Sequence, residues 1–242
     1  MSVTTPELPI GFAHRGGAQQ RHLQNTLAAF VQSMALGATA IESDVGLTAD
    51  GVAVLIHPGI VARLRRPVSS LRRDQLPANV PTLEELYREC GPNLDVALDM
   101  AAPAAVEQVV ATARAHGDPT RLWLTYWRVD ALARWRQRYS DVRLVFPSLV
   151  LRTASAQRRC ALLRDAGVDA LNLHHRTCTA QRVALVHGSG LLLFGWGARG
   201  GAAAARTLRN GADGVFCDDT IAMVGVVTAE RARRQRLLSE AR

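Results

Sequence analysis

The chain has 242 residues, is 48% hydrophobic and carries a formal net charge of +8, so it holds enough apolar sequence for one large core. All 29 of its positively charged residues are arginine, and none is lysine. This excludes enzymes that form a Schiff base or attach pyridoxal phosphate through lysine, and it excludes P-loops, which also require one.

The four cysteines, Cys90, Cys160, Cys178 and Cys217, lie far apart and form no CxxC pair. This spacing indicates neither a zinc site nor a disulfide framework, so we expect reduced thiols in a cytoplasmic protein. No apolar run approaches the about 20 residues of a membrane helix. Met1–Pro9 lacks the basic start and apolar stretch of a signal peptide. We therefore expect neither an integral membrane segment nor a signal peptide.

The positive charge favours phosphate-bearing substrates, anionic lipid or nucleic acid as partners. The arginines are spread along the chain and are not interleaved with aromatic residues, so we expect no nucleic-acid partner. One local cluster, between Arg231 and Arg236, is typical of a solvated helix face.

Eight short apolar runs have the length and composition of buried strands. In chain order, the predicted strands are Ile10–Ala13, Ala40–Val45, Leu94–Asp99, Leu122–Thr125, Leu144–Phe146, Ala170–Leu173, Leu191–Phe194 and Gly214–Cys217. A ninth extended segment, Val54–His57, follows the second strand across a turn at Asp50-Gly51. We interpret it as an antiparallel ribbon inside a loop.

Longer segments of helical character separate these runs, and many end at a glycine, as helix carboxyl termini often do. The predicted helices are Thr26–Leu36, Leu83–Cys90, Ala104–His116, Val129–Tyr139, Ala156–Ala166, Ala180–His187 and Ala202–Asn210. Strands that alternate with helices predict a parallel sheet closed into a (β/α)8 TIM barrel. Because no linker divides the chain, we expect a single domain over residues 1–242.

Two carboxylates stand at the end of the second predicted strand. Residues i and i+2 of a strand point to the same face, so Glu42 and Asp44 lie side by side. Carboxylates this close repel each other unless a cation lies between them, and Mg²⁺ or Ca²⁺ is the natural occupant. The turn at Asp50-Gly51 can bring His57 back toward the same metal.

Other reactive side chains also fall at predicted strand ends. His14 and Arg15 end the first strand, Asp99 ends the third, and Trp196 and Asp218 follow later strands. The active site of a TIM barrel lies at the carboxyl ends of its strands, so these residues should share one rim. Two histidines, an arginine and several carboxylates suit metal-assisted cleavage of a phosphate ester.

The chain resembles the glycerophosphodiester phosphodiesterase family in motifs that run almost from end to end. The matching motifs are Ala13-His14-Arg15-Gly16, Asn25-Thr26-Leu27-Ala28-Ala29-Phe30, Glu42-Ser43-Asp44-Val45, Thr48-Ala49-Asp50-Gly51, Ile56-His57, Val80-Pro81-Thr82-Leu83-Glu84-Glu85, Trp196 and Gly211-Ala212-Asp213-Gly214-Val215-Phe216. The resemblance implies a TIM barrel that uses one divalent metal ion. It also implies cleavage of glycerophosphodiesters into an alcohol and glycerol 3-phosphate.

The resemblance implies that His14 and His57 are the acid/base pair and that Arg15 holds the phosphate. Trp196, which matches the family, would contact the substrate through its ring. One histidine would deprotonate the nucleophile, either water or a substrate hydroxyl, and the other would protonate the leaving alcohol. The sequence leaves open which histidine does which. The expected substrate is a small phosphodiester or a lysophospholipid.

Glu42 and Asp44 would bind the metal, and Asp99 stands where the family carries a third acidic ligand. The family motif there is Glu-x-Lys, whereas this chain has Asp99-Met100-Ala101, so the family lysine is absent. Arg176 or Arg199, both expected on rim loops, could supply the missing charge.

Three alternatives remain open for the activity. The first is a metal-dependent phosphodiesterase. The second is a cyclising lyase, because an aspartate in the third acidic position also occurs in the related sphingomyelinase D-like phospholipases. The third is a barrel with impaired catalysis that binds a phosphorylated ligand, since Gln24 and Pro58 replace two family acids and the lysine is missing. The leaving alcohol, the choice of Mg²⁺ or Ca²⁺ and the oligomeric state are not readable from the residues.

Overall fold

Eight parallel strands form the barrel in the computed structural model, which describes residues 9–17, 24–57, 65–149, 151 and 155–240. The strands are β1 (Ile10–His14), β2 (Ala40–Leu47), β4 (Asp95–Met100), β5 (Leu122–Thr125), β6 (Arg143–Ser148), β7 (Ala170–His174), β8 (Leu192–Ala198) and β9 (Gly214–Cys217). The sheet runs in the order β1, β9, β8, β7, β6, β5, β4, β2, and pairing of β1 with β2 closes it. The predicted (β/α)8 TIM barrel is confirmed.

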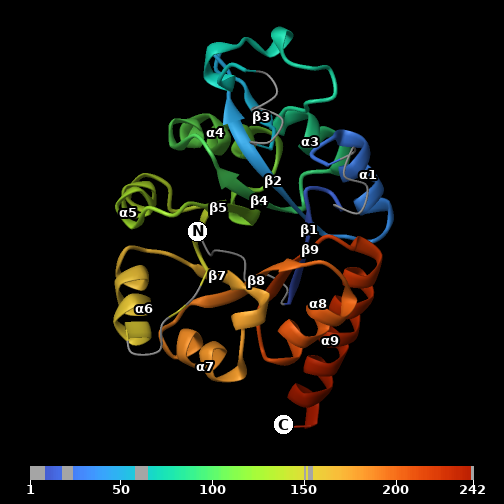
Figure 1. Ribbon diagram of the computed structural model, residues 1–242, viewed down its shortest axis with the longest axis vertical. Coiled ribbons are helices and arrows are strands. Elements are labelled where there is room, and N and C mark those ends of the chain that lie inside the picture. Colours follow the sequence, from blue (N-terminus) through green and yellow to red (C-terminus); the bar gives the residue numbers. More distant parts are fainter. Residues whose placement is uncertain (1–8, 18–23, 58–64, 150, 152–154, 241–242) are drawn as a thin grey trace.

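Helices surround the barrel and connect its strands, as Figure 1 shows. They are α1 (Leu27–Ala35), α3 (Leu83–Cys90), α4 (Val106–His116), α5 (Val129–Arg138), α6 (Ala156–Asp165), α7 (Ala180–Gly188), α8 (Gly201–Arg209) and α9 (Thr220–Glu240). Their starts have local causes in the sequence. The Thr26 hydroxyl accepts the N–H of Ala29 at the start of α1, and Thr82 and Glu85 form a reciprocal cap at the start of α3.

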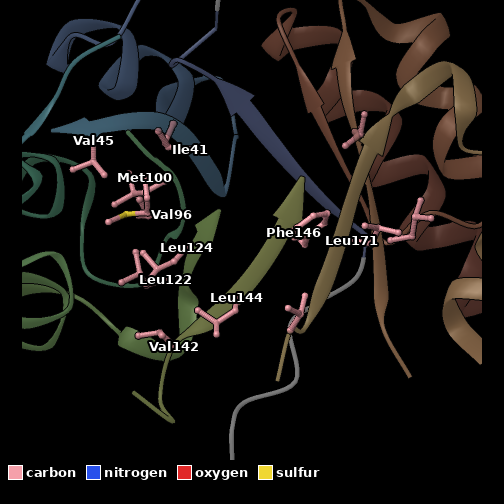
Figure 2. Close-up of a cluster of buried hydrophobic side chains, with 14 of the residues drawn as sticks. Ile41, Val45, Val96, Met100, Leu122, Leu124, Val142, Leu144, Phe146 and Leu171 are labelled. Carbon is pink, nitrogen blue, oxygen red and sulfur yellow. The ribbon is translucent and has the colours of Figure 1, made fainter. Parts of the chain in front are cut away.

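Side chains along each strand alternate between the barrel interior and the layer beneath the helices. Inside, the aromatic rings of Phe12, Trp123, Phe194 and Phe216 pack together, and Phe12 stacks on Phe216 with ring centroids 4.5 Å apart. Outside, aliphatic side chains of neighbouring strands form a continuous buried layer, part of which Figure 2 shows. The interior is therefore a packed core that forms the floor of any site above it.

One inward-facing position beyond the aromatic core, the strands reach the carboxyl-terminal rim of the barrel. His14, Thr125, Trp196 and Asp218 each stand two residues after one of the four inner aromatic rings. All four line a single cavity. The period of two that builds the core therefore also delivers polar side chains to the rim.

The predicted ribbon is also confirmed. Strand β3 (Ala53–Leu55) pairs antiparallel with β2, and the turn between them uses Gly51 at a φ of +79°, which favours glycine. Beyond β3, the N–H of Ile56 donates to the carbonyl oxygen of Asp44 at 2.9 Å. This contact returns the chain to the end of β2 and brings His57 next to it.

The arginines of α9 are not simply the solvated face that the sequence predicts. Arg233 and Arg234 both bind Glu230, which is only 5% exposed. Arg234 also donates to the backbone carbonyl oxygens of Leu208 and Ala212. Because these carbonyls lie at the end of α8 and just before β9, part of the cluster holds α9 against the barrel.

Within the described part of the chain, no helix is long and apolar enough to cross a membrane. The expectation of no signal peptide concerns mainly residues 1–8, which lie outside the described residues. Pro58, which replaces a family aspartate, lies outside them as well. The absence of a signal peptide stays a prediction.

Candidate active site

A cavity of about 1200 Å³ opens at the carboxyl-terminal ends of the strands. The predicted site residues that line it are His14, Arg15, Glu42, Asp99 and Trp196. Asp44 and His57 do not line the cavity in this structure. They nevertheless act electrostatically on each other and on lining residues, so they lie close to it.

The ring of His14 is fixed at one nitrogen. Its Nδ1 lies 2.6 Å from Asp218 Oδ1, and its Nε2 lies 3.8 Å from Glu42 Oε2. Burial opposes protonation of His14, but the charge of Glu42 and the hydrogen bond to Asp218 outweigh it and raise the pKa of His14. Burial would raise the pKa of Asp218, yet the contact with His14 lowers it. Asp218 thus orients the imidazole and leaves Nε2 as the reactive nitrogen.

The position of Arg15 is fixed by a hydrogen bond from its backbone to Glu42. Its φ is +54°, and its N–H donates to Glu42 Oε2 at 2.9 Å. The next residue, Gly16, has a φ of +74°, and a Cβ there would come within 2.7 Å of Phe30, so the turn requires glycine. Arg15 Nε faces Asp44 Oδ2 at 3.8 Å, and neither buried atom has a hydrogen-bond partner in the described structure. An anion and a cation would satisfy these two atoms respectively.

The pKa values of Glu42, Asp44 and Asp99 are all raised. Burial is the largest cause for each, and it brings the pKa of Glu42 to about 8 and that of Asp99 to about 6. Repulsion from Asp99 and Asp44 adds to the shift of Glu42. Asp99 differs from the other two acids in exposure, because its side chain opens into the cavity and is solvent-exposed. The pKa of Asp44 is also raised by burial, although His57 and Arg15 oppose the rise.

These acids fit a hard divalent cation in charge and donor atom, because Mg²⁺ and Ca²⁺ prefer carboxylate oxygens. The unpartnered Asp44 Oδ2 is one such donor. Among the described residues, however, no three His, Cys, Asp or Glu side chains are already close enough together to hold an ion. Binding would require Glu42, Asp44 and Asp99 to draw together, so their role as metal ligands stays a prediction.

His57 lies two residues beyond β3 and is half-buried. Burial lowers its pKa, the charge of Asp44 opposes this, and the charges of Arg15 and His14 lower it further. His57 therefore lies on the acidic side of the site, within electrostatic range of Asp44 and His14. Its role in catalysis stays a prediction.

The opposite wall of the cavity is basic and comes from the segments that follow β7 and β8. Its basic side chains are those of His174, His175, Arg176, Arg199 and Arg206. Trp196 also lies on this wall, at an irregularity in the pairing of β8 with β9 between Gly195 and Ala198. Its ring meets the ring of His174 edge-on, with centroids 4.8 Å apart.

Two uncharged polar residues that line the cavity, Thr125 and Asn172, were not singled out from the sequence, and neither were His174, His175 and Arg206 of the basic wall. Thr125 and Asn172 are both buried, and Asn172 Oδ1 has no hydrogen-bond partner in the described structure. Each of these two stands two residues after an inward-facing residue of its strand, β5 or β7, and this period of two could have identified them. Asp218 is placed on the rim by the sequence, but its contact with His14 joins residues 204 positions apart and is not readable there.

The sequence pattern of the "Glycerophosphoryl diester phosphodiesterase family" matches residues 14–222. The chain is 38% identical over 111 residues to "Probable glycerophosphodiester phosphodiesterase 2" of Mycobacterium tuberculosis, over 42% of each chain. It is 35% identical over 112 residues to "Glycerophosphodiester phosphodiesterase 1" of Homo sapiens, over 38% of this chain and 34% of the relative. The matched region thus spans less than half the length of these two relatives.

Solved structures show the same fold. A putative glycerophosphoryl diester phosphodiesterase from Silicibacter pomeroyi aligns with a TM-score of 0.76 and 21% identity, over 93% of this chain and 95% of that one. An Oleispira antarctica phosphodiesterase in complex with the product sn-glycerol-3-phosphate aligns with a TM-score of 0.76 and 19% identity, over 91% and 97%. At sequence identities this low, the structural similarity establishes only a shared fold.

Proposed function

Because the chain belongs to the glycerophosphoryl diester phosphodiesterase family, we propose that it cleaves a small glycerophosphodiester, or a similar phosphodiester, into an alcohol and a phosphomonoester. The observation that carries the proposal is the arrangement around His14. Its ring is hydrogen-bonded to Asp218 at 2.6 Å and lines the cavity together with Arg15, Glu42 and Asp99. An oriented imidazole next to an arginine and carboxylates suits attack on a phosphate ester.

His14 and His57 would divide the proton transfers. One takes a proton from the attacking water or hydroxyl, and the other gives a proton to the leaving alcohol oxygen. Asp218 holds the Nδ1 proton of His14, so His14 would act through Nε2. His57 would act from the ribbon beyond β3, next to Asp44.

The phosphate would be held by arginine. Arg15 offers an unpartnered Nε, and its backbone is fixed by Glu42. Glu42, Asp44 and Asp99 would hold a divalent cation, Mg²⁺ or Ca²⁺, which supplies positive charge to the phosphate oxygens when it is bound.

Arg199 is our candidate for the charge that the family lysine supplies. It lines the cavity, and its charge acts on Asp218, the partner of His14. Position 101 itself cannot be expected to serve this purpose. Strand β4 ends at Met100, and the N–H of Ala101 turns back to the carbonyl oxygen of Asp99 at 3.0 Å. Two residues beyond Asp99, an extended strand would have pointed residue 101 to the same face, but β4 ends before it.

Phosphorus NMR tests the proposal. Wild type would be incubated with glycerophosphocholine, glycerophosphoethanolamine and lysophosphatidylcholine, each with Mg²⁺ or Ca²⁺ and with the His14→Ala variant as control. A phosphomonoester signal that depends on His14 supports hydrolysis. A cyclic phosphate signal would point to the cyclising lyase, and unchanged substrate in every mixture would favour a barrel that binds phosphate esters without cleaving them.

A further inference from the structure

Three arginines of the basic wall have charges that no acidic side chain among the described residues balances through an ion pair. Arg176, Arg199 and Arg206 line the cavity, and none of them belongs to an ion pair with an Asp or Glu among the described residues. Several other described arginines form ion pairs with acids; Arg121, for example, pairs with Asp95 at 3.0 Å. Unpaired cations that face a common cavity are free to bind an anion.

These three arginines share the basic wall but have different neighbours. Arg199 follows Ala198, whose carbonyl oxygen accepts the N–H of Asp218 at 2.9 Å, and the charge of Arg199 acts on Asp218. Arg206 contacts His175 at 3.2 Å, and the charges of Arg206 and Arg176 act on His175. One arginine therefore stands beside the partner of His14, and the other two stand around His175, which follows β7. The cavity volume of about 1200 Å³ exceeds the about 300–1,000 Å³ of typical ligand pockets, so a substrate can reach both places.

His175 positions Arg206. The imidazole is only 9% exposed, and its Nδ1 lies 3.2 Å from Arg206 Nη2. Because the guanidinium can only donate, Nδ1 of His175 must accept, and the imidazole is neutral. Asn210 at the end of α8 donates to the carbonyl oxygen of Cys178 at 2.8 Å, which ties this helix to the segment that follows β7. Arg206 on α8 and Arg176 after β7 therefore belong to segments that are hydrogen-bonded to each other.

The start of α8 adds backbone donors to the same place. Gly200 and Gly201 line the cavity, and the helix has neither a side-chain cap nor an acidic residue in its first turn. An uncapped helix start presents free N–H groups and a partial positive charge. Independently, Asn172 lines this cavity, is 6% exposed, and has an Oδ1 without a hydrogen-bond partner in the described structure. A buried acceptor of this kind calls for a hydroxyl on the ligand.

We propose that Arg176, Arg206 and the amino-terminal end of α8 form a second phosphate subsite, which binds a phosphate carried by the alcohol half of the substrate. The inference rests on the proposed function and specifies its substrate class. The preferred substrates are glycerophosphodiesters of a phosphorylated polyol, whose hydroxyl groups also suit Asn172. Cationic alcohols such as choline are disfavoured, because they would face the same arginines.

The test compares two substrates that differ by one phosphate, glycerophosphoinositol and glycerophosphoinositol 4-phosphate. Wild type should show the larger kcat/KM for the phosphorylated compound. Arg206→Gln and Arg176→Gln should each lower the ratio of the two kcat/KM values by about tenfold, as expected for loss of a charge-assisted hydrogen bond. Arg209→Gln is the matched control, because Arg209 is an exposed arginine of the same helix that does not line the cavity. An equal or smaller kcat/KM for the phosphorylated compound would overturn the proposal.

Binding separates this proposal from the proposed function. Calorimetry with His14→Ala should show tighter binding of glycerophosphoinositol 4-phosphate than of glycerophosphoinositol, even if neither compound is ever cleaved. The double variants that add Arg206→Gln or Arg176→Gln should lose that difference. Inorganic phosphate alone distinguishes a substrate subsite from a site for free phosphate. If inorganic phosphate binds as tightly as the phosphorylated diester and competes with it, the substrate assignment is overturned.

Discussion

The two walls of the cavity differ in charge and in how that charge is balanced. On the wall formed by β1, β2 and β4, Glu42 and Asp99 line the cavity with Asp44 nearby, and the pKa of all three acids is raised. On the wall that follows β7 and β8, Arg176 and Arg206 have no acidic partner among the described residues. The charges of the two walls do not neutralise each other. The site therefore suits two kinds of ligand charge at once, a cation at the acids and phosphate at the arginines.

The largest expected effect concerns the histidines of the acidic wall. His14→Ala and His57→Ala should each lower phosphodiester cleavage by about 10²–10⁴-fold, the usual contribution of a positioned acid or base. The rate is measured by phosphorus NMR under saturating metal. His187→Ala is the matched control, because His187 makes the same kind of pair, with Asp213 at 2.7 Å, and does not line the cavity. Equal losses in all three variants would mean that the histidines act on the fold and not on the reaction.

The acids should bind a metal in competition with protons. Glu42→Gln or Asp99→Asn should weaken Mg²⁺ or Mn²⁺ binding by about 100-fold or more, beyond the about 10–100-fold seen when only an outer partner is lost. Since metal binding requires deprotonated carboxylates, affinity should fall as the pH drops through about 8 and then about 6, the pKa values of Glu42 and Asp99. Calorimetry in buffers of different ionisation enthalpy measures the protons released. Binding without proton release near pH 7 would contradict the assignment.

Asp218 should matter less than the histidine that it holds. Asp218→Asn keeps the side-chain size but removes the charge, and we expect a loss of about 10–100-fold in kcat, typical of a mis-positioned catalytic group. The hydrogen bond to Asp218 raises the pKa of His14. The variant should therefore move the limb of the pH–rate profile that reports His14 to lower pH. An unchanged profile with a lower rate would assign Asp218 a purely structural role.

The smallest effects should come from the substitute for the family lysine. Arg199→Gln should lower kcat/KM on an unphosphorylated glycerophosphodiester by about tenfold, as expected for one charge-assisted contact. Ala101→Lys should give little gain, because residue 101 lies beyond the end of β4 and does not line the cavity. A large gain in the Ala101→Lys variant would show that the missing lysine limits the rate and that Arg199 does not replace it.

The barrel was predictable from the sequence because its signals are local. Alternation of strand and helix, glycine at helix ends and the Asp50-Gly51 turn each specify a short segment, and the confirmed barrel and ribbon follow from them. The same period of two placed His14, Glu42 and Asp99 on the inner face of their strands. Family membership was likewise readable from the motifs and is shown by the match over residues 14–222.

The contacts within the site were not predictable, because they join distant parts of the chain. The bond between His14 and Asp218 and the contact between His175 and Arg206 depend on how the barrel closes and where α8 lies. The turn after β4, in which the N–H of Ala101 donates to the carbonyl oxygen of Asp99, was likewise not predicted, although the end of the strand was placed within one residue. The metal, the individual catalytic roles, the single-domain organisation and the cytoplasmic location stay predictions.

A crystal structure with Mn²⁺ and glycerol 3-phosphate, analysed by anomalous scattering, tests the two-wall account most directly. The account predicts one manganese peak bound by oxygen atoms of Glu42, Asp44 and Asp99, with the phosphate between that ion and the Arg15 guanidinium. A manganese peak elsewhere, or a phosphate that contacts neither the ion nor Arg15 while both ligands are at saturating concentration, would contradict it.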